Sequence, residues 1–184
     1  MLLHGLGTEG SSWRYQIKAL GEAGYRPISI DVPGFGRSNF TGKRWSISFS
    51  ARVVNELAGS LREEKYHIAG ISMGGTIALQ TALDFPVRIK SLVLLNTFAT
   101  LRPKRMNEWV YLLRRYIKAR LGGAGSQAVI TARRLFPKAG QEDLREELIR
   151  HIRQTDPIVY KAAMLALGTY DARRNLKSMQ MPVM

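Results

Sequence analysis

The first hundred residues alternate between short apolar blocks and segments with apolar residues at helical spacing. The apolar blocks lie at 1–4, 26–30, 66–71 and 91–95. Short apolar runs bounded by turn residues are typical of buried strands. The segments between them carry apolar residues three or four positions apart, within 13–20, 49–61 and 76–83. Strands that alternate with helices predict an α/β fold with a mainly parallel sheet, and the unbroken Leu/Val run of the fourth block predicts burial on both faces.

The pattern changes near residue 100 and is helical from there almost to the end. We expect helices over 126–136, 141–153 and 156–167, after a segment, 102–120, in which Arg and Lys crowd with Trp and Tyr. A Gly-rich break at 122–125 separates that segment from the first of these helices. Residues 181–184 have the composition of the first residues of another strand.

A serine stands where the third strand meets the following helix. The residues there read Gly70-Ile71-Ser72-Met73-Gly74-Gly75, which matches the pattern G-x-S-x-G. A sharp turn presents a weakly nucleophilic hydroxyl to a base, and it needs small residues where the strand and helix backbones nearly touch. The pattern alone arises by chance in roughly one such sequence in ten. A glycine-rich turn that only closes a strand–helix unit is therefore the alternative interpretation.

Two further glycine-rich turns follow the first and second strands. Residues 4–7 read HGLG, and residues 31–38 read DVPGFGRS. With the serine turn, they stand in the order and at the spacing of the α/β-hydrolase superfamily, which the first hundred residues closely resemble and the rest more loosely. We expect Asp31 and Arg37 to be structural partners rather than catalytic residues.

The resemblance implies a site and a reaction. Ser72 would be the nucleophile toward a small-molecule acyl substrate, an ester, thioester or lactone, through an acyl-enzyme. The backbone N–H groups of Leu6 and Met73 would form the oxyanion hole. The residues that would shape the site around them are His4, Gly5, Gly70 and Gly74. The resemblance implies no cofactor and no metal, and it places the strands in the order second, first, third, fourth.

The resemblance also divides the chain into three parts. Residues 1–100 would be the hydrolase core, 101–168 an all-helical cap, and 169–184 a return to the core. The family places its acid and its histidine after the strand that would begin near Pro182. We therefore expect an incomplete chain, lacking both residues and catalytically impaired.

None of the three histidines is a good substitute for that base. His4 belongs to the oxyanion turn, and His67 lies at the far end of the strand that leads to Ser72. His151 falls in a charged segment that we expect to face solvent. Asn96, which ends the fourth strand where some relatives carry their acid, cannot hold a charge.

Composition changes the picture little. The absence of cysteine excludes disulfides and thiolate metal sites and fits a cytoplasmic location. No apolar run is long enough for a membrane span. The formal net charge of +14 would suit an anionic partner, but no nucleic-acid motif accompanies it, and we expect a solvated basic surface. The alternatives are a non-catalytic binding module that keeps the crevice, and a nucleic-acid-binding protein.

Overall fold

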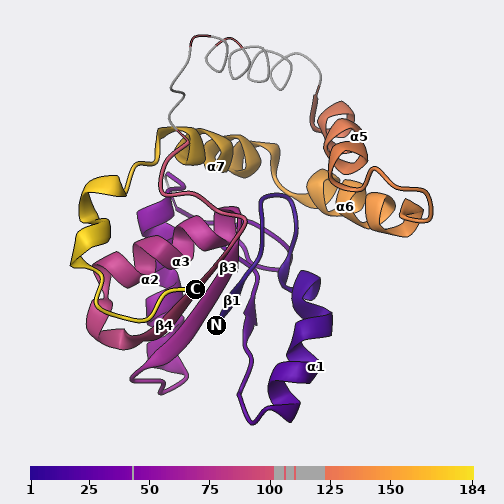
Figure 1. Ribbon diagram of the computed structural model, residues 1–184. Coiled ribbons are helices and arrows are strands. Elements are labelled where there is room, and N and C mark those ends of the chain that lie inside the picture. The colour runs from indigo at the N-terminus through magenta and orange to yellow at the C-terminus, as the bar shows by residue number, and fades with distance from the viewer. Residues whose placement is uncertain (43, 102–105, 107–109, 111–122) are drawn as a thin grey trace.

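A computed structural model describes residues 1–101 except 43, residues 106 and 110, and residues 123–184 (Figure 1). The basic and aromatic side chains predicted to crowd segment 102–120 lie outside the described residues.

Four parallel strands form one sheet in the order β2-β1-β3-β4. They are β1 (Leu2–Leu3), β2 (Ser29–Ile30), β3 (Tyr66–Ile71) and β4 (Ile89–Leu95). The order confirms the α/β class and the predicted strand arrangement. Register brings Leu3 of β1 opposite Gly70 of β3, so the turns that follow these two strands open at the same edge of the sheet.

The C-terminal residues lie along the outer edge of β4. Val183 pairs with Leu92 in a parallel bridge, and the N–H of Met184 donates to the carbonyl of Leu92 at 3.0 Å. The expected strand-like character of residues 181–184 is therefore confirmed by this one parallel bridge.

Helices α2 (Ile47–Ser60) and α3 (Met73–Asp84) lie together beside the sheet, and α3 packs directly on β1, β3 and β4. The core between them includes Ile68, Ile77 and Leu92, all fully buried. Helix α1 (Arg14–Glu22) lies on the other side of the strands in Figure 1 and has no buried residue. Apolar side chains at helical spacing therefore form the core on the α3 side.

The expectation that β4 is buried on both faces is wrong. Ile89 and Leu92 are buried, whereas Val93 is half-buried and Leu95 is 40% exposed. Side chains alternate between the two faces of a strand, and α3 covers the face that carries Leu92. The continuous Leu/Val run reflects strand propensity more than burial at this position.

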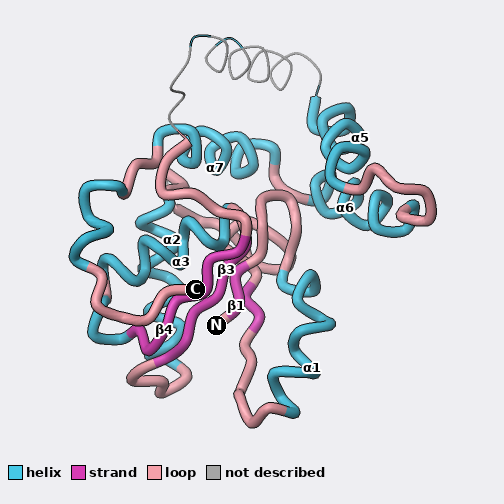
Figure 2. The backbone as a smooth tube through the Cα atoms, in the orientation of Figure 1, coloured by secondary structure: helices cyan, strands magenta, loops and turns pink. Residues whose placement is uncertain are grey.

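Three helices follow the undescribed segment: α5 (Gly123–Leu135), α6 (Glu142–Gln154) and α7 (Pro157–Thr169). Helix α5 begins three residues before its predicted start, so residues 123–125 of the predicted glycine break lie in its first turn. Val159, Ala163 and Leu167 of α7 join the main core. Helices α5 and α6 share a separate cluster, and Figure 2 shows them beside the main body. No helix in the described ranges has the length and apolar character to cross a membrane.

Short 3-10 turns complete the described chain, at Gly10–Trp13, Pro86–Arg88 and Arg173–Ser178.

Candidate functional site

Ser72 lies in the turn between β3 and α3 with an unusual backbone conformation. Its φ is 51° and its ψ is −114°, a region that residues with a side chain rarely adopt. Four hydrogen bonds hold the turn. The Leu95 carbonyl accepts from the Ser72 N–H at 3.0 Å, and the Ser72 carbonyl accepts from the Thr76 N–H at 3.0 Å, from Thr76 Oγ1 at 3.2 Å and from Thr97 Oγ1 at 2.7 Å. Residues forced into such conformations cluster at functional sites.

The side chain of Ser72 is half-buried, and its hydroxyl has no hydrogen-bond partner within the described part of the chain. The loop after β1 lies beside it. A Cβ added to Gly5 would lie 3.8 Å from the Cβ of Ser72. The Cβ of Ser72 therefore lies beside the HGLG turn, and its half-buried side chain is not enclosed in the core.

Glycines allow the backbones around Ser72 to approach one another closely. A Cβ at Gly70 would lie 2.2 Å from the carbonyl oxygen of Gly74, and a Cβ at Gly74 would lie 2.3 Å from the carbonyl oxygen of Leu3. Atoms cannot approach so closely without a backbone shift. Strand β1, the end of β3 and the first turn of α3 are thus in backbone contact, which brings the residues at 3–5 and 70–74 together.

His4 is fully buried and holds the carbonyl of Gly5. The N–H of Val32 donates to Nε2 of His4 at 3.0 Å, so that nitrogen carries no proton. The neutral ring then carries its proton on Nδ1, which donates to the Gly5 carbonyl at 2.8 Å. Burial lowers the pKa of His4 to about 4, despite the opposing effect of this hydrogen bond. At neutral pH the ring is therefore an uncharged donor.

The Gly5 carbonyl accepts two more hydrogen bonds, from the Thr8 N–H at 3.2 Å and from Thr8 Oγ1 at 2.9 Å. Because the peptide unit is planar and trans, fixing this carbonyl also fixes the opposite direction of the Leu6 N–H. The N–H groups of Leu6 and Met73 have no acceptor among the groups that the structure describes. Two donors thus remain available beside Ser72.

Asp31 holds the second glycine-rich turn together. Its carboxylate accepts from the N–H of Gly10 at 2.7 Å and from the N–H of Arg37 at 3.1 Å. Burial alone would raise the pKa of Asp31, but these two hydrogen bonds, together with the nearby charge of Arg37, hold the pKa below its usual value. The Arg37 guanidinium lies 3.7 Å away and is almost fully exposed. The prediction that Asp31 and Arg37 are structural partners is confirmed. Their main contact is the hydrogen bond from the backbone N–H of Arg37 to the Asp31 carboxylate.

The other candidate bases lie in different surroundings. His67 accepts or donates a hydrogen bond with Ser91 at 2.7 Å. It stands five residues before Ser72 on β3, which places it about 16 Å away along the strand. Asn96 is exposed and adopts a φ of 44° after β4.

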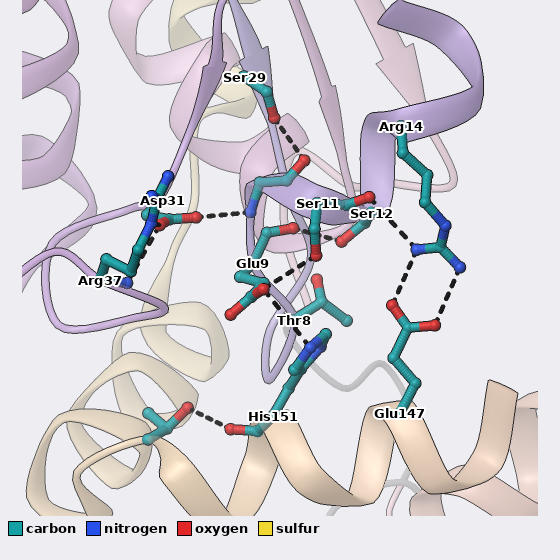
Figure 3. Close-up of polar contacts among 12 residues, drawn as sticks. Thr8, Glu9, Ser11, Ser12, Arg14, Ser29, Asp31, Arg37, Glu147 and His151 are labelled. Carbon is teal, nitrogen blue, oxygen red and sulfur yellow. Dashed lines mark hydrogen bonds and ion pairs between the residues drawn. The ribbon is translucent and has the colours of Figure 1, made fainter. Parts of the chain in front are cut away.

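The expectation that His151 faces solvent is wrong. Its side chain is only 9% exposed, and Nε2 lies 3.6 Å from Oε1 of Glu9 (Figure 3). The charged residues of α6 suggested a solvated helix, but one side of the helix lies against the loop that follows β1.

Sequence reasoning missed two residues at this site, Thr8 and Thr97. Both fix backbone groups, Thr8 at the Gly5 carbonyl and Thr97 at the Ser72 carbonyl. Their position was the available signal, since each follows the carboxyl end of a parallel strand, where such sheets build their binding crevices.

Comparisons with known proteins agree with this geometry. A family model described as alpha/beta hydrolase fold matches residues 1–143. The chain is 38% identical over 100 residues to a putative carbamate hydrolase RutD of Variovorax paradoxus, covering 54% of this chain and 38% of that protein. It is 40% identical over 102 residues to a 2-hydroxy-6-oxononadienedioate/2-hydroxy-6-oxononatrienedioate hydrolase of Paraburkholderia phymatum, covering 52% of this chain and 35% of that protein.

Solved structures match over nearly the whole chain. A hydrolase from Pseudomonas aeruginosa superposes with a TM-score of 0.84 at 25% identity, covering 99% of this chain and 68% of that one. The enol-lactonase from Burkholderia xenovorans superposes with a TM-score of 0.80 at 25% identity, and the match covers 99% of this chain and 69% of the enol-lactonase chain. The chain therefore spans less than half the length of the two curated relatives and about two thirds of these structures.

Proposed function

Because the chain belongs to the α/β-hydrolase fold family, we propose that it is a serine hydrolase sequence with Ser72 as the nucleophile. The substrate is a carboxylic ester, thioester or lactone, cleaved through an acyl-enzyme. The observation that carries the proposal is the strained conformation of Ser72, with a φ of 51° and an unpartnered hydroxyl beside the HGLG turn. A turn that only closed a strand–helix unit would not need a serine in this conformation.

The reaction follows from the groups around Ser72. Its Oγ attacks the carbonyl carbon of the substrate, and the proton of the hydroxyl passes to a base. The N–H groups of Leu6 and Met73 donate to the oxyanion that develops, and each such donor is typically worth about 3 kcal/mol in the transition state. The leaving group departs with a proton, and water then attacks the acyl-Ser72 ester to release the acid.

His4, Gly5, Gly70 and Gly74 serve this site indirectly. His4 holds the Gly5 carbonyl, so that the Leu6 N–H is oriented before a substrate arrives. Gly70 and Gly74 allow the close backbone contacts that place the Met73 N–H at the start of α3. In this role the glycines permit the backbone geometry of the site and take no part in the chemistry.

The substrate class agrees with the names of the relatives. They include a carbamate hydrolase, a methyl ester esterase and an enol-lactonase, and each of these substrates presents a carbonyl carbon. We propose that residues 101–168 form a cap over the crevice, with α7 packed on the core and α6 against the HGLG turn.

We further propose that the 184-residue chain by itself is catalytically impaired. His4 has both ring nitrogens engaged, His67 is at the wrong end of β3, and His151 faces Glu9. Without a base hydrogen-bonded to the serine, turnover falls by about 10⁴ to 10⁶.

Labelling with a fluorophosphonate, followed by mass spectrometry, tests both parts. We expect slow labelling of Ser72 to one equivalent, none in Ser72→Ala, and an unchanged rate in Ser178→Ala, which alters an exposed serine. A folded chain in which Ser72 is never labelled would overturn the nucleophile and favour a non-catalytic binding module. Rapid labelling, at the rate of a complete serine hydrolase, would overturn the claim of impairment.

A further inference from the structure

We propose that helix α6 positions the Leu6 N–H, through Ile152 and through the polar residues Glu147 and His151 of the same helix. This inference rests on the proposed function, because it assigns α6 a part in preparing the oxyanion hole. We call residues 4–9 the HGLG loop, which extends the four-residue motif by Thr8 and Glu9.

The closest approach is between Ile152 and the backbone of Gly7. Gly7 has a φ of 76°, and a Cβ added there would lie 2.6 Å from Cγ1 of Ile152 and 3.2 Å from Cε2 of Tyr160. Ile152 itself is only 1% exposed. The helix therefore presses on the backbone of the residue directly after Leu6, with no side chain between them.

Polar contacts extend this approach along the loop. His151 lies 3.6 Å from Glu9, and Glu147 forms a two-pronged ion pair with Arg14, at 2.8 and 2.9 Å. Glu147 and His151 are four positions apart and so lie on one side of α6, and Ile152 follows His151 directly, about 100° further around the helix. Figure 3 shows the Glu147 and His151 side chains rising from α6 toward the loop and the start of α1.

The Leu6 peptide is thus held from two directions. On one side, three donors from His4 and Thr8 fix the Gly5 carbonyl. On the other side, Ile152 and Tyr160 limit the movement of Gly7. A glycine with a positive φ has wide backbone freedom of its own, so the packing of α6 is what restricts rotation on the Gly7 side.

The consequence is that Ile152 has two roles, in packing α6 against α5 and in limiting the movement of Gly7. The side of α6 that carries Ile152 orients a donor, and its residues are positioning residues that touch no substrate atom. Ile152 also belongs to the buried cluster shared with α5, against which Ile149 packs as a partly buried residue. Ile149 therefore supplies a matched control for lost cluster packing, because it is the same residue type on the same helix and is not among the side chains nearest to a Cβ added at Gly7.

The test compares Ile152→Ala with Ile149→Ala. Ser72 is acylated with a chromophoric acyl imidazole, and the infrared carbonyl stretch of the acyl-serine reports the strength of the oxyanion-hole hydrogen bonds. We expect Ile152→Ala to shift this stretch to higher frequency and to slow acylation about tenfold, since small misplacements of a catalytic group have such effects. We expect Ile149→Ala and the wild type to behave alike. Ile152→Val, which removes one methyl group, should give a smaller change in the same direction if the alanine variant folds poorly.

Amide hydrogen exchange across residues 5–8 provides a readout that needs no acylation. Faster exchange in Ile152→Ala than in Ile149→Ala supports the coupling. Equal exchange in the two variants, or an unshifted acyl carbonyl in Ile152→Ala, overturns it. If no acyl-Ser72 forms even in the wild type, the proposed function fails and the role of α6 in the reaction fails with it, whatever the exchange result.

Discussion

The Ser72 turn and the α5–α6 pair are held together in different ways. At the turn, backbones of three elements touch, and a single added carbon at Gly70 would overlap the Gly74 carbonyl. In the pair, contact is made by a small cluster of apolar side chains, Ala128, Ala132, Leu148 and Ile152. The turn therefore depends on the identity of particular residues, whereas the pair depends on an amphipathic pattern that many sequences satisfy.

The largest expected effect is at the turn. Gly70→Ala should lower the free energy of unfolding by more than about 3 kcal/mol, because the new Cβ would lie 2.2 Å from a backbone oxygen. Gly140 lies in the connection between α5 and α6, and a Cβ added there meets no atom within 4 Å. Gly140→Ala should lower the free energy of unfolding by only about 1 kcal/mol, because alanine disfavours the φ of 78° at this position. Urea unfolding of both variants measures the difference, and equal losses would remove the contrast between the regions.

The second effect concerns His4 and acid. The folded protein holds the pKa of His4 at about 4 against an ordinary value of 6.5, so the unfolded chain binds more protons between these values. Stability from the neutral ring is complete above pH 6.5 and declines as the pH falls to 4, by about 3 kcal/mol. Asp31 acts in another window: its lowered pKa contributes stability above pH 3.8 that is lost below it.

His4→Gln keeps a donor and an acceptor but cannot titrate. We expect its unfolding free energy to change less with pH between 6.5 and 4 than that of the wild type. Identical pH slopes for the two proteins would show that His4 is not kept neutral by burial.

A third effect separates the two regions directly. Leu148→Ala should cost about 2 kcal/mol, at the low end for a buried leucine because the cluster around it is small. The loss should be local, with faster amide exchange in α5 and α6 and unchanged exchange in β3. A uniform loss of protection throughout the chain would mean that the pair and the core unfold as one unit.

The smallest effect is at the ion pair between Glu147 of α6 and Arg14 of α1. Glu147→Gln should lower the unfolding free energy by about 0.5 kcal/mol, because both partners are partly exposed. Glu22→Gln, which removes the far more exposed pair with Lys18, should have no measurable effect. High salt should abolish the difference between these variants, and a difference that persists in salt would contradict an electrostatic origin.

The same contrast explains which parts of the structure could be predicted. The strand order was implied by the family resemblance that the three glycine-rich turns carry. The contact between the HGLG and serine turns follows from glycines that close backbone contact requires, so there the residues specify the geometry. The helices at 142–154 and 157–169 follow from apolar spacing within one or two residues. The spacing of apolar residues identifies the apolar face of a helix. It does not predict which loop packs against the polar face of the same helix.

The burial of His151 was missed for that reason. Its neighbours on α6 are charged, and only the three-dimensional approach of Glu9 removes it from water. Thr97 was missed because a threonine after a strand has many possible roles, and its hydrogen bond to the Ser72 carbonyl depends on the conformation of the turn. The half-open face of β4 was missed because strand propensity and burial favour the same residue types.

Three donors on the Gly5 carbonyl have a consequence for molecular recognition. A carbonyl oxygen has two lone pairs, and here they are already fully shared. The peptide between Gly5 and Leu6 can therefore offer a bound molecule a hydrogen-bond donor but no acceptor. An oxygen atom of a ligand can accept a hydrogen bond there, whereas the hydroxyl or amine hydrogens of that ligand need acceptors elsewhere.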